Sequence, residues 1–139
     1  MAGARVLGLQ LAGSMLLAAC TATAYSPLPV DLGGRLPPDA YGRCKEVMQN
    51  LGALEVADEQ AFLLRTAWYP IDDPLGERRA TVFRDADPYA GPDLAVVVEF
   101  RRPSLPLFGL PQWSSPRGDP VAEHELVESL RQALTAQRP

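Results

Sequence analysis

Few side chains in this 139-residue sequence could do chemistry, and they are far apart. The only histidine, His124, lies between two glutamates, whereas a metal site usually needs several convergent ligands. The serines lack a nucleophile-elbow sequence, and the paired aspartates lack the spacing and distal glutamate of a calcium loop. We therefore predict an exposed His124 and a non-enzymatic protein with no catalytic residue, cofactor or metal.

Cys20 is the one reactive side chain that belongs to a recognisable motif. A positive charge at Arg5 precedes the uncharged apolar run Val6–Leu17, and the small residues Ala18 and Ala19 come directly before the cysteine. Such an order is typical of a segment that enters a translocon and is cleaved by a signal peptidase. The segment Leu17-Ala18-Ala19-Cys20 resembles the lipobox of bacterial lipoproteins.

The resemblance implies that residues 1–19 are a signal peptide and that Cys20 becomes a lipidated first residue, carrying diacylglyceryl on sulfur and an acyl group on nitrogen. An ordinary secretory signal and an uncleaved anchor are the alternatives. The run is short for a bilayer span, which needs about 20 residues. Several acyl chains exceed the two-signal threshold for stable anchoring. Because Thr21 and not Asp follows the cysteine, the resemblance favours the outer membrane, with the domain in the periplasm.

The charge balance argues against nucleic acid as a partner. Cleavage after residue 19 removes Arg5 from the 13 basic residues and none of the 17 acidic ones, so the formal charge changes from -4 to about -5. A moderately acidic surface adds no general electrostatic attraction to anionic lipid. The remaining chain is long enough for one small domain.

Cys44 would be left without a disulfide partner if Cys20 is lipidated, because the sequence has two cysteines. It lies on an apolar helical stripe. A buried small hydrophobe is the favoured interpretation, over a reactive or intermolecular thiol.

The segment that follows the lipobox is rich in proline and glycine. We predict that residues 20–38 form the lipidated N-terminus and a flexible tether, and that residues 39–139 form the folded domain. The 18 residues from Thr21 to Pro38 could reach about 60 Å when fully extended.

Hydrophobic periodicity predicts an α+β domain with two layers. An N-terminal helix is expected at Asp39–Leu51, with Asp39 as its cap, and a C-terminal helix after Asp119 and Pro120. Between them, alternating apolar residues predict a three- to four-stranded antiparallel meander, with strands at 54–57, 62–69, 78–84 and 94–101. The register of 78–84 stays ambiguous, because both of its faces are partly apolar. The order loosely resembles small helix-and-sheet domains of envelope lipoproteins.

Arg102–Pro120 is the most unusual segment after Cys20. Its prolines exclude a regular helix or a central strand. Large apolar side chains nevertheless recur among them, at Leu105, Leu107, Phe108, Leu110 and Trp113. They could cover the sheet as an irregular flap, or contact a protein partner or the membrane.

Two basic pairs, Arg78-Arg79 and Arg101-Arg102, lie near predicted strand ends, where we expect them to snorkel or to meet nearby carboxylates. Binding of a lipid headgroup or another polyanion is the alternative. The sequence favours a lipid-anchored envelope accessory or protein-interaction module, held to the membrane through Cys20. The alternative is a carrier of an apolar ligand or lipid between the helices and the sheet.

Overall fold

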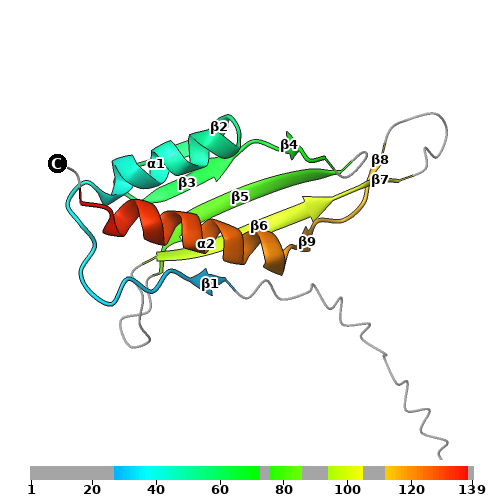
Figure 1. Ribbon diagram of the computed structural model, residues 1–139. Coiled ribbons are helices and arrows are strands. Elements are labelled where there is room, and N and C mark those ends of the chain that lie inside the picture. Colours follow the sequence, from blue (N-terminus) through cyan, green and yellow to red (C-terminus); the bar gives the residue numbers. More distant parts are fainter. Residues whose placement is uncertain (1–26, 73–75, 86–93, 105–111, 138–139) are drawn as a thin grey trace, which may run out of the picture.

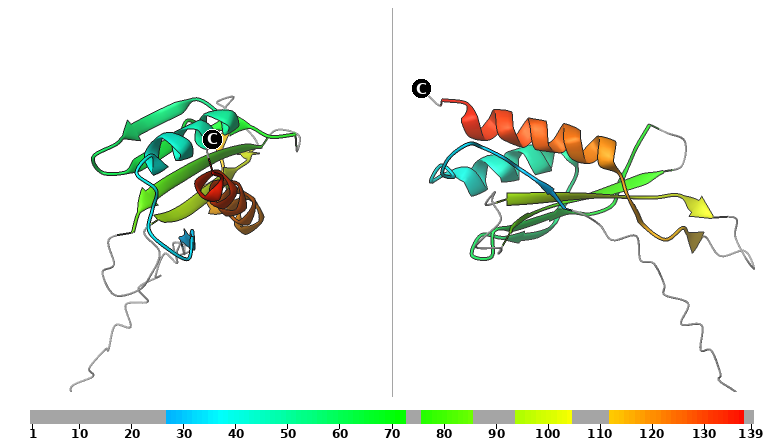
Figure 2. Two further views of the ribbon diagram at one scale, coloured as in Figure 1. Left: turned by 60° about the vertical axis from the view of Figure 1, so that its left-hand side comes forward. Right: turned by 90° about the horizontal axis from the view of Figure 1, so that it is seen from below.

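The structure, a computed structural model, describes residues 27–72, 76–85, 94–104 and 112–137. The expected signal peptide and Cys20 lie outside these residues. The described chain forms the predicted α+β fold, with both helices on one side of an antiparallel sheet (Figures 1 and 2). In chain order its elements are β1 (Leu28–Pro29), α1 (Ala40–Leu51), β2 (Leu54–Asp58), β3 (Leu63–Thr66), β4 (Tyr69–Pro70), β5 (Glu77–Arg84), β6 (Leu94–Arg101), β7 (Pro103–Ser104), β8 (Gln112–Trp113), β9 (Arg117–Gly118) and α2 (Pro120–Thr135).

The predicted meander is confirmed in the strand order of the main sheet, which is β1-β6-β5-β3-β2. The four longer strands, β2, β3, β5 and β6, pair antiparallel with one another in chain order, as short connections favour. The short strands β4 and β9 pair with β5 and β6, and β7 pairs with β8 as a separate two-stranded ribbon.

The two helices begin differently from each other. The side chain of Asp119 accepts a hydrogen bond from the backbone N–H of Ala122 at 3.1 Å, so the predicted cap of α2 is confirmed. The predicted cap of α1 is wrong, because the side chain of Asp39 makes no capping bond. Its carboxylate instead accepts a hydrogen bond from Arg43 Nε at 2.8 Å, one helical turn away.

The helix-facing side of the sheet resolves the ambiguous register of β5. Ala80 and Val82 are fully buried, and Val82 lies opposite Val96 of β6. Thr81 and Phe83, which point to the other face, are only partly buried. Because side chains alternate along a strand, one register places the smaller residues of β5 beneath the helices.

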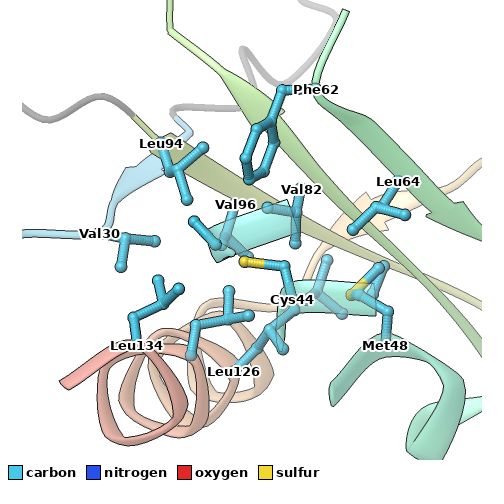
Figure 3. Close-up of a cluster of buried hydrophobic side chains, with 14 of the residues drawn as sticks. Val30, Cys44, Met48, Phe62, Leu64, Val82, Leu94, Val96, Leu126 and Leu134 are labelled. Atoms are coloured by element: carbon cyan, nitrogen blue, oxygen red, sulfur yellow. The ribbon is translucent and has the colours of Figure 1, made fainter. Parts of the chain in front are cut away.

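One hydrophobic core lies between the helices and the sheet, and Figure 3 shows its side chains converging from both layers. Cys44 and Met48 enter it from α1, and Leu130 enters it from α2. The strands contribute its other wall. The fully or nearly fully buried strand residues on this side are Leu64, Ala80, Val82, Leu94, Val96 and Val98.

The folded domain starts earlier than predicted. Leu28 and Pro29 pair with Val96 and Ala95 of β6, and Val30, at 1% exposure, belongs to the core. The prediction of a free tether extending to Pro38 is therefore wrong for the segment from Leu28 onward. The burial of Val30 and the pairing of β1 with β6 hold this segment on the folded domain, despite its prolines and glycines.

Candidate functional site

Cys44 is a structural residue within the core. Its side chain is fully buried, and burial raises the pKa of its thiol to about 12. The prediction of a buried small hydrophobe is confirmed, and the neutral thiol is not poised for nucleophilic chemistry.

His124 is exposed on α2, as predicted, and its Nδ1 lies 2.7 Å from the carbonyl oxygen of Pro120. A carbonyl oxygen can only accept, so Nδ1 carries the proton and donates it. Within the described ranges, no group of three His, Cys, Asp or Glu side chains is arranged to hold a metal ion.

The face of the sheet opposite the helices carries a network of arginines, carboxylates and tryptophan. Arg79 pairs with Glu99 at 2.7 Å, and Arg101 Nε donates to Glu77 at 2.8 Å across the same two strands. Both guanidinium groups lie over the ring of Trp68, at 4.7 and 4.1 Å from its centre.

Arg78, Arg79 and Arg101 of the two basic pairs meet carboxylates, as predicted. Besides the two pairs on the open face, Arg78 Nε donates to Asp119 at 2.8 Å on the helix side of the sheet. All three pairs are partly buried, so the arginines hold strands together and are partly withdrawn from solvent.

Trp68 corrects a prediction about the first long strand. The sequence places Phe62, Leu64, Thr66 and Trp68 on one face, and the first three are buried as expected. The strand β3 ends at Thr66, however, and pairing with β5 resumes at β4 in a register shifted by one residue, because Arg65 lies opposite Thr81 but Tyr69 lies opposite Arg78. That break interrupts the alternation, and Trp68 stacks against arginines of the opposite face.

Trp113 lies on the β7–β8 ribbon, which is held by pairing of Pro103 with Trp113 and of Ser104 with Gln112. Its side chain is 42% exposed, and the guanidinium of Arg101 lies 4.3 Å from its ring centre. Arg101 therefore contacts two tryptophans: Trp68, which follows β3, and Trp113, which lies in β8. The other predicted contact residues, Leu105, Leu107, Phe108 and Leu110, lie outside the described residues.

A hollow of about 380 Å³ lies beside this ribbon, at the end of β6. Two arginines, two serines and one aromatic ring line it: Phe100, Arg102, Ser114, Ser115 and Arg117. Arg102 is half of a basic pair in the sequence, but no sequence pattern indicates that Arg117 lies beside it. Only the pairing of β9 with β6, which puts Arg117 opposite Phe100, brings the two arginines to one place.

A second hollow, of about 350 Å³, opens between the helices and the sheet. Val47 and Leu51 of α1, Leu126 of α2 and the ring of Tyr69 form much of its wall. Burial raises the pKa of the Tyr69 hydroxyl above its ordinary value. The hollow lies between the helices and the sheet, where the apolar-ligand hypothesis expects one.

Two polar side chains, Thr66 and Glu123, are buried, although no sequence-based expectation placed Glu123 in the core. Thr66 accepts a hydrogen bond from the backbone N–H of Ala80 at 3.0 Å, and Glu123 accepts one from that of Val98 at 3.1 Å. The helical spacing of residues 123, 126, 130 and 134 is a signal that could have placed Glu123 on the buried stripe.

Comparison with protein-family models, with curated proteins and with solved structures finds no match to this chain. Within the part of the chain that the structure describes, neither helix has the length and apolar character that crossing a bilayer requires.

Proposed function

We propose that the protein is a lipid-anchored, non-enzymatic accessory or interaction module of the bacterial envelope, attached to the outer membrane with its domain in the periplasm. The observation that carries this proposal is the segment Leu17-Ala18-Ala19-Cys20, which resembles a lipobox and follows a charged start and an apolar run. Acyl chains on Cys20 supply the membrane affinity.

The start of the folded domain limits how far the module stands from its anchor. Leu28 lies eight positions after Cys20 along the chain, and at about 3.6 Å per position this stretch spans at most about 29 Å. This is half the reach that a tether ending at Pro38 would have. The domain therefore works close to the membrane surface.

The open face of the sheet supports the interaction role. It presents Trp68 with its stacked arginines, and aromatic and arginine side chains are the residue types enriched at the centres of protein interfaces. At the other edge of the sheet, β2 pairs only with β3 among the described strands. A partner strand could add to that edge.

Replacing the lipidated residue tests the anchor. The variant Cys20→Ala should appear in the soluble periplasmic fraction, whereas the unaltered protein sediments with membranes and is released only by detergent. A matched Thr21→Ala variant, which keeps the cysteine, should stay with the membrane. Integral association of Cys20→Ala would refute lipid anchoring through this residue.

Crosslinking in native membranes tests the interaction role. The expected result is recovery of a defined envelope protein, reduced when Trp68 is changed to Ala and retained when the exposed Val121 of α2 is changed. Recovery of no partner would argue against an interaction module.

A triple variant tests whether the apolar side chains of the segment Arg102–Pro120 cover the sheet or contact a partner. Leu107, Phe108 and Trp113 are changed together to Ser. A large fall in melting temperature indicates that they cover the sheet, and unchanged stability with lost association indicates that they contact a partner.

The second candidate function, a carrier of an apolar ligand, is favoured by the hollow between the helices and the sheet, whose volume of about 350 Å³ falls within the range of ligand sites. Ser129 lines this hollow, and a Ser129→Trp variant would fill it. Lipid that co-purifies with the unaltered protein and is lost from this variant would favour the carrier. Absence of lipid from both would exclude it.

A further inference from the structure

The hollow between the helices and the sheet lies where the end of α1 meets the start of α2. Arg43, near the start of α1, donates to the carbonyl oxygens of Ala133 and Ala136, so the two helices run in opposite directions (Figure 1). The hollow uses the other ends of both helices. Its α2 wall is one helical stripe, about 10 Å long at 1.5 Å per residue, formed by Ala122, Glu125, Leu126 and Ser129.

The strand side of the hollow is held by packing and by an ion pair. Tyr69 lies opposite Arg78 in the β4–β5 pair, and both side chains line the hollow. Tyr69 also packs on the end of α1, because a Cβ on Gly52 would lie 3.1 Å from the Cβ of Tyr69. Arg78 Nε donates to the carboxylate of Asp119 at 2.8 Å, and Asp119 caps α2. The hollow is therefore preformed, and a ligand would need little rearrangement to enter it.

Much of the lining is apolar. Val98 of β6 and Leu126 of α2 both line the hollow and are 1% and 4% exposed. Leu51 of α1 also lines it, and its side chain is still 37% exposed. An apolar group placed in the hollow would remove such surface from water, which is the main source of affinity for a small ligand site.

The charges around the hollow are not balanced. Arg78 is paired with Asp119, so it offers no unpaired positive charge to a ligand. Glu125 lines the hollow from the exposed side of α2, and within the described ranges its carboxylate makes no hydrogen bond or ion pair. The whole chain is also acidic, with a formal charge of -4. A carboxylate or phosphate on a ligand would be repelled here, whereas an ammonium group would be attracted.

Two further groups suit an ammonium ion beside this carboxylate. The amide of Asn50 supplies an additional acceptor at the hollow, and the ring of Tyr69 supplies an aromatic face, which attracts cations. The volume of about 350 Å³ lies near the lower end of the range for ligand sites. It favours a small molecule with one short apolar chain.

We infer that this hollow binds a small cationic amphiphile, with its apolar chain between the helices and the sheet and its ammonium group at Glu125. The inference rests on the second candidate function, the carrier of an apolar ligand, and names the ligand class. Charge complementarity selects amines over fatty acids and anionic lipids.

Photolabelling of the full-length protein tests this ligand class. The protein is held in discs of phosphatidylcholine, which has no net charge and so does not concentrate amines at the membrane surface. Octyl probes with the same diazirine in the chain are compared, ending in an ammonium, a hydroxyl or a carboxylate group. The ammonium probe should label the peptides that contain Leu51 and Leu126 most strongly, and the carboxylate probe least. Excess unlabelled octylamine should compete, and mass spectrometry of the peptides measures the label.

Removal of one charge tests the role of Glu125. Glu125→Gln keeps the size of the side chain, and labelling by the ammonium probe well below saturation should fall about two- to five-fold, as expected for one exposed ion pair. Labelling by the hydroxyl probe should not change. The matched control is Glu128→Gln, which removes a carboxylate of the same helix that pairs with Arg131 outside the hollow. It should leave the labelling by both probes unchanged.

Filling the hollow tests the place of binding. Ser129→Trp should abolish labelling of these peptides by every probe, and circular dichroism checks that the variant is folded. Label that persists in the folded variant would refute the site. If the variant does not fold, competition by octylamine and the comparison of Glu125→Gln with Glu128→Gln still decide.

The outcomes separate the ligand class from the carrier function. If no probe labels the hollow, both are refuted. If the hydroxyl or carboxylate probe labels it as strongly as the ammonium probe, or if Glu125→Gln acts no more strongly than Glu128→Gln, the carrier stands and the selection of amines is refuted. Anchoring through Cys20 is tested independently by the release of Cys20→Ala from the membrane.

Discussion

The two faces of the sheet use alternate residues of the same strands for opposite purposes. On the helix side, Ala80, Val82 and Val98 are buried against α1 and α2 and make the core. On the open side, Arg79 and Glu99 form an ion pair next to Trp68. Burial of apolar area stabilises the fold strongly, whereas partly exposed ion pairs add little. Most of the stabilisation therefore comes from the helix-covered face, so residues of the open face can be used for contacts at little cost to the fold.

The largest loss of stability should come from a cavity on the covered face. Leu130→Ala removes a fully buried side chain between α2 and the sheet, and such changes cost about 2–5 kcal/mol. Val121→Ala, on the exposed side of the same helix, should cost less than about 0.5 kcal/mol. Thermal and urea unfolding measure both, and equal losses would break the distinction between the faces.

A buried hydrogen bond on the covered face should come second. Thr66→Val keeps the shape of the side chain but leaves the N–H of Ala80 without its acceptor, at a cost of about 1–3 kcal/mol. Thr66→Ser keeps the hydroxyl and therefore the hydrogen bond, so it should lose only the packing of one methyl group. Urea midpoints compare the pair; a serine variant less stable than the valine one would contradict the assignment.

Alkaline pH should weaken the core through Cys44. Its folded pKa of about 12 lies above the ordinary value of 9.0, so its contribution is complete below about pH 9 and is lost as pH rises toward 12. At pH 10 the loss is about 1 kcal/mol relative to neutral pH. Cys44→Ala should lack this part of the pH dependence. Identical slopes above pH 9 for both proteins would argue against a buried thiol.

The smallest effect should come from the open face. Arg101→Met breaks its pair with Glu77 while keeping an apolar stem near the tryptophans, and we expect a loss of about 0.5–1 kcal/mol that shrinks at high salt. The exposed pair of Arg131 with Glu128 supplies the control, and Arg131→Met should change stability less. If Arg101→Met lowered the free energy of unfolding as much as Leu130→Ala, the open face would stabilise the fold as strongly as the core.

The elements with strong local signals were predictable. Asp119 and Pro120 mark the start of α2, and the apolar alternation in residues 94–101 marks β6, because caps and periodicity act over a few residues. Asp39 carries the same sequence signal as a cap. Its carboxylate instead binds Arg43, which also donates to the carbonyl oxygens of Ala133 and Ala136 of the other helical segment. A long-range partner decided that local choice.

The surface sites were less predictable than the elements. The ribbon, β1 and β9 are two-residue strands whose sequences are rich in proline, glycine and serine, and they exist because β6 or a neighbouring segment offers free backbone groups. Arg102 and Arg117 are fifteen positions apart and no periodicity relates them. Their meeting depends on the pairing of β9, which local propensity does not indicate.

By itself, the sequence determined the lipobox-like segment ending at Cys20, the order of the two helices and the four longer strands, and the burial of Cys44, since each follows from residue types within a short window. Tertiary structure alone decided that Val30 joins the core, that Trp68 turns to the arginine face, and that Arg102 and Arg117 line one hollow. These outcomes depend on which strands pair across long separations, because pairing fixes register and register fixes the face on which each side chain lies.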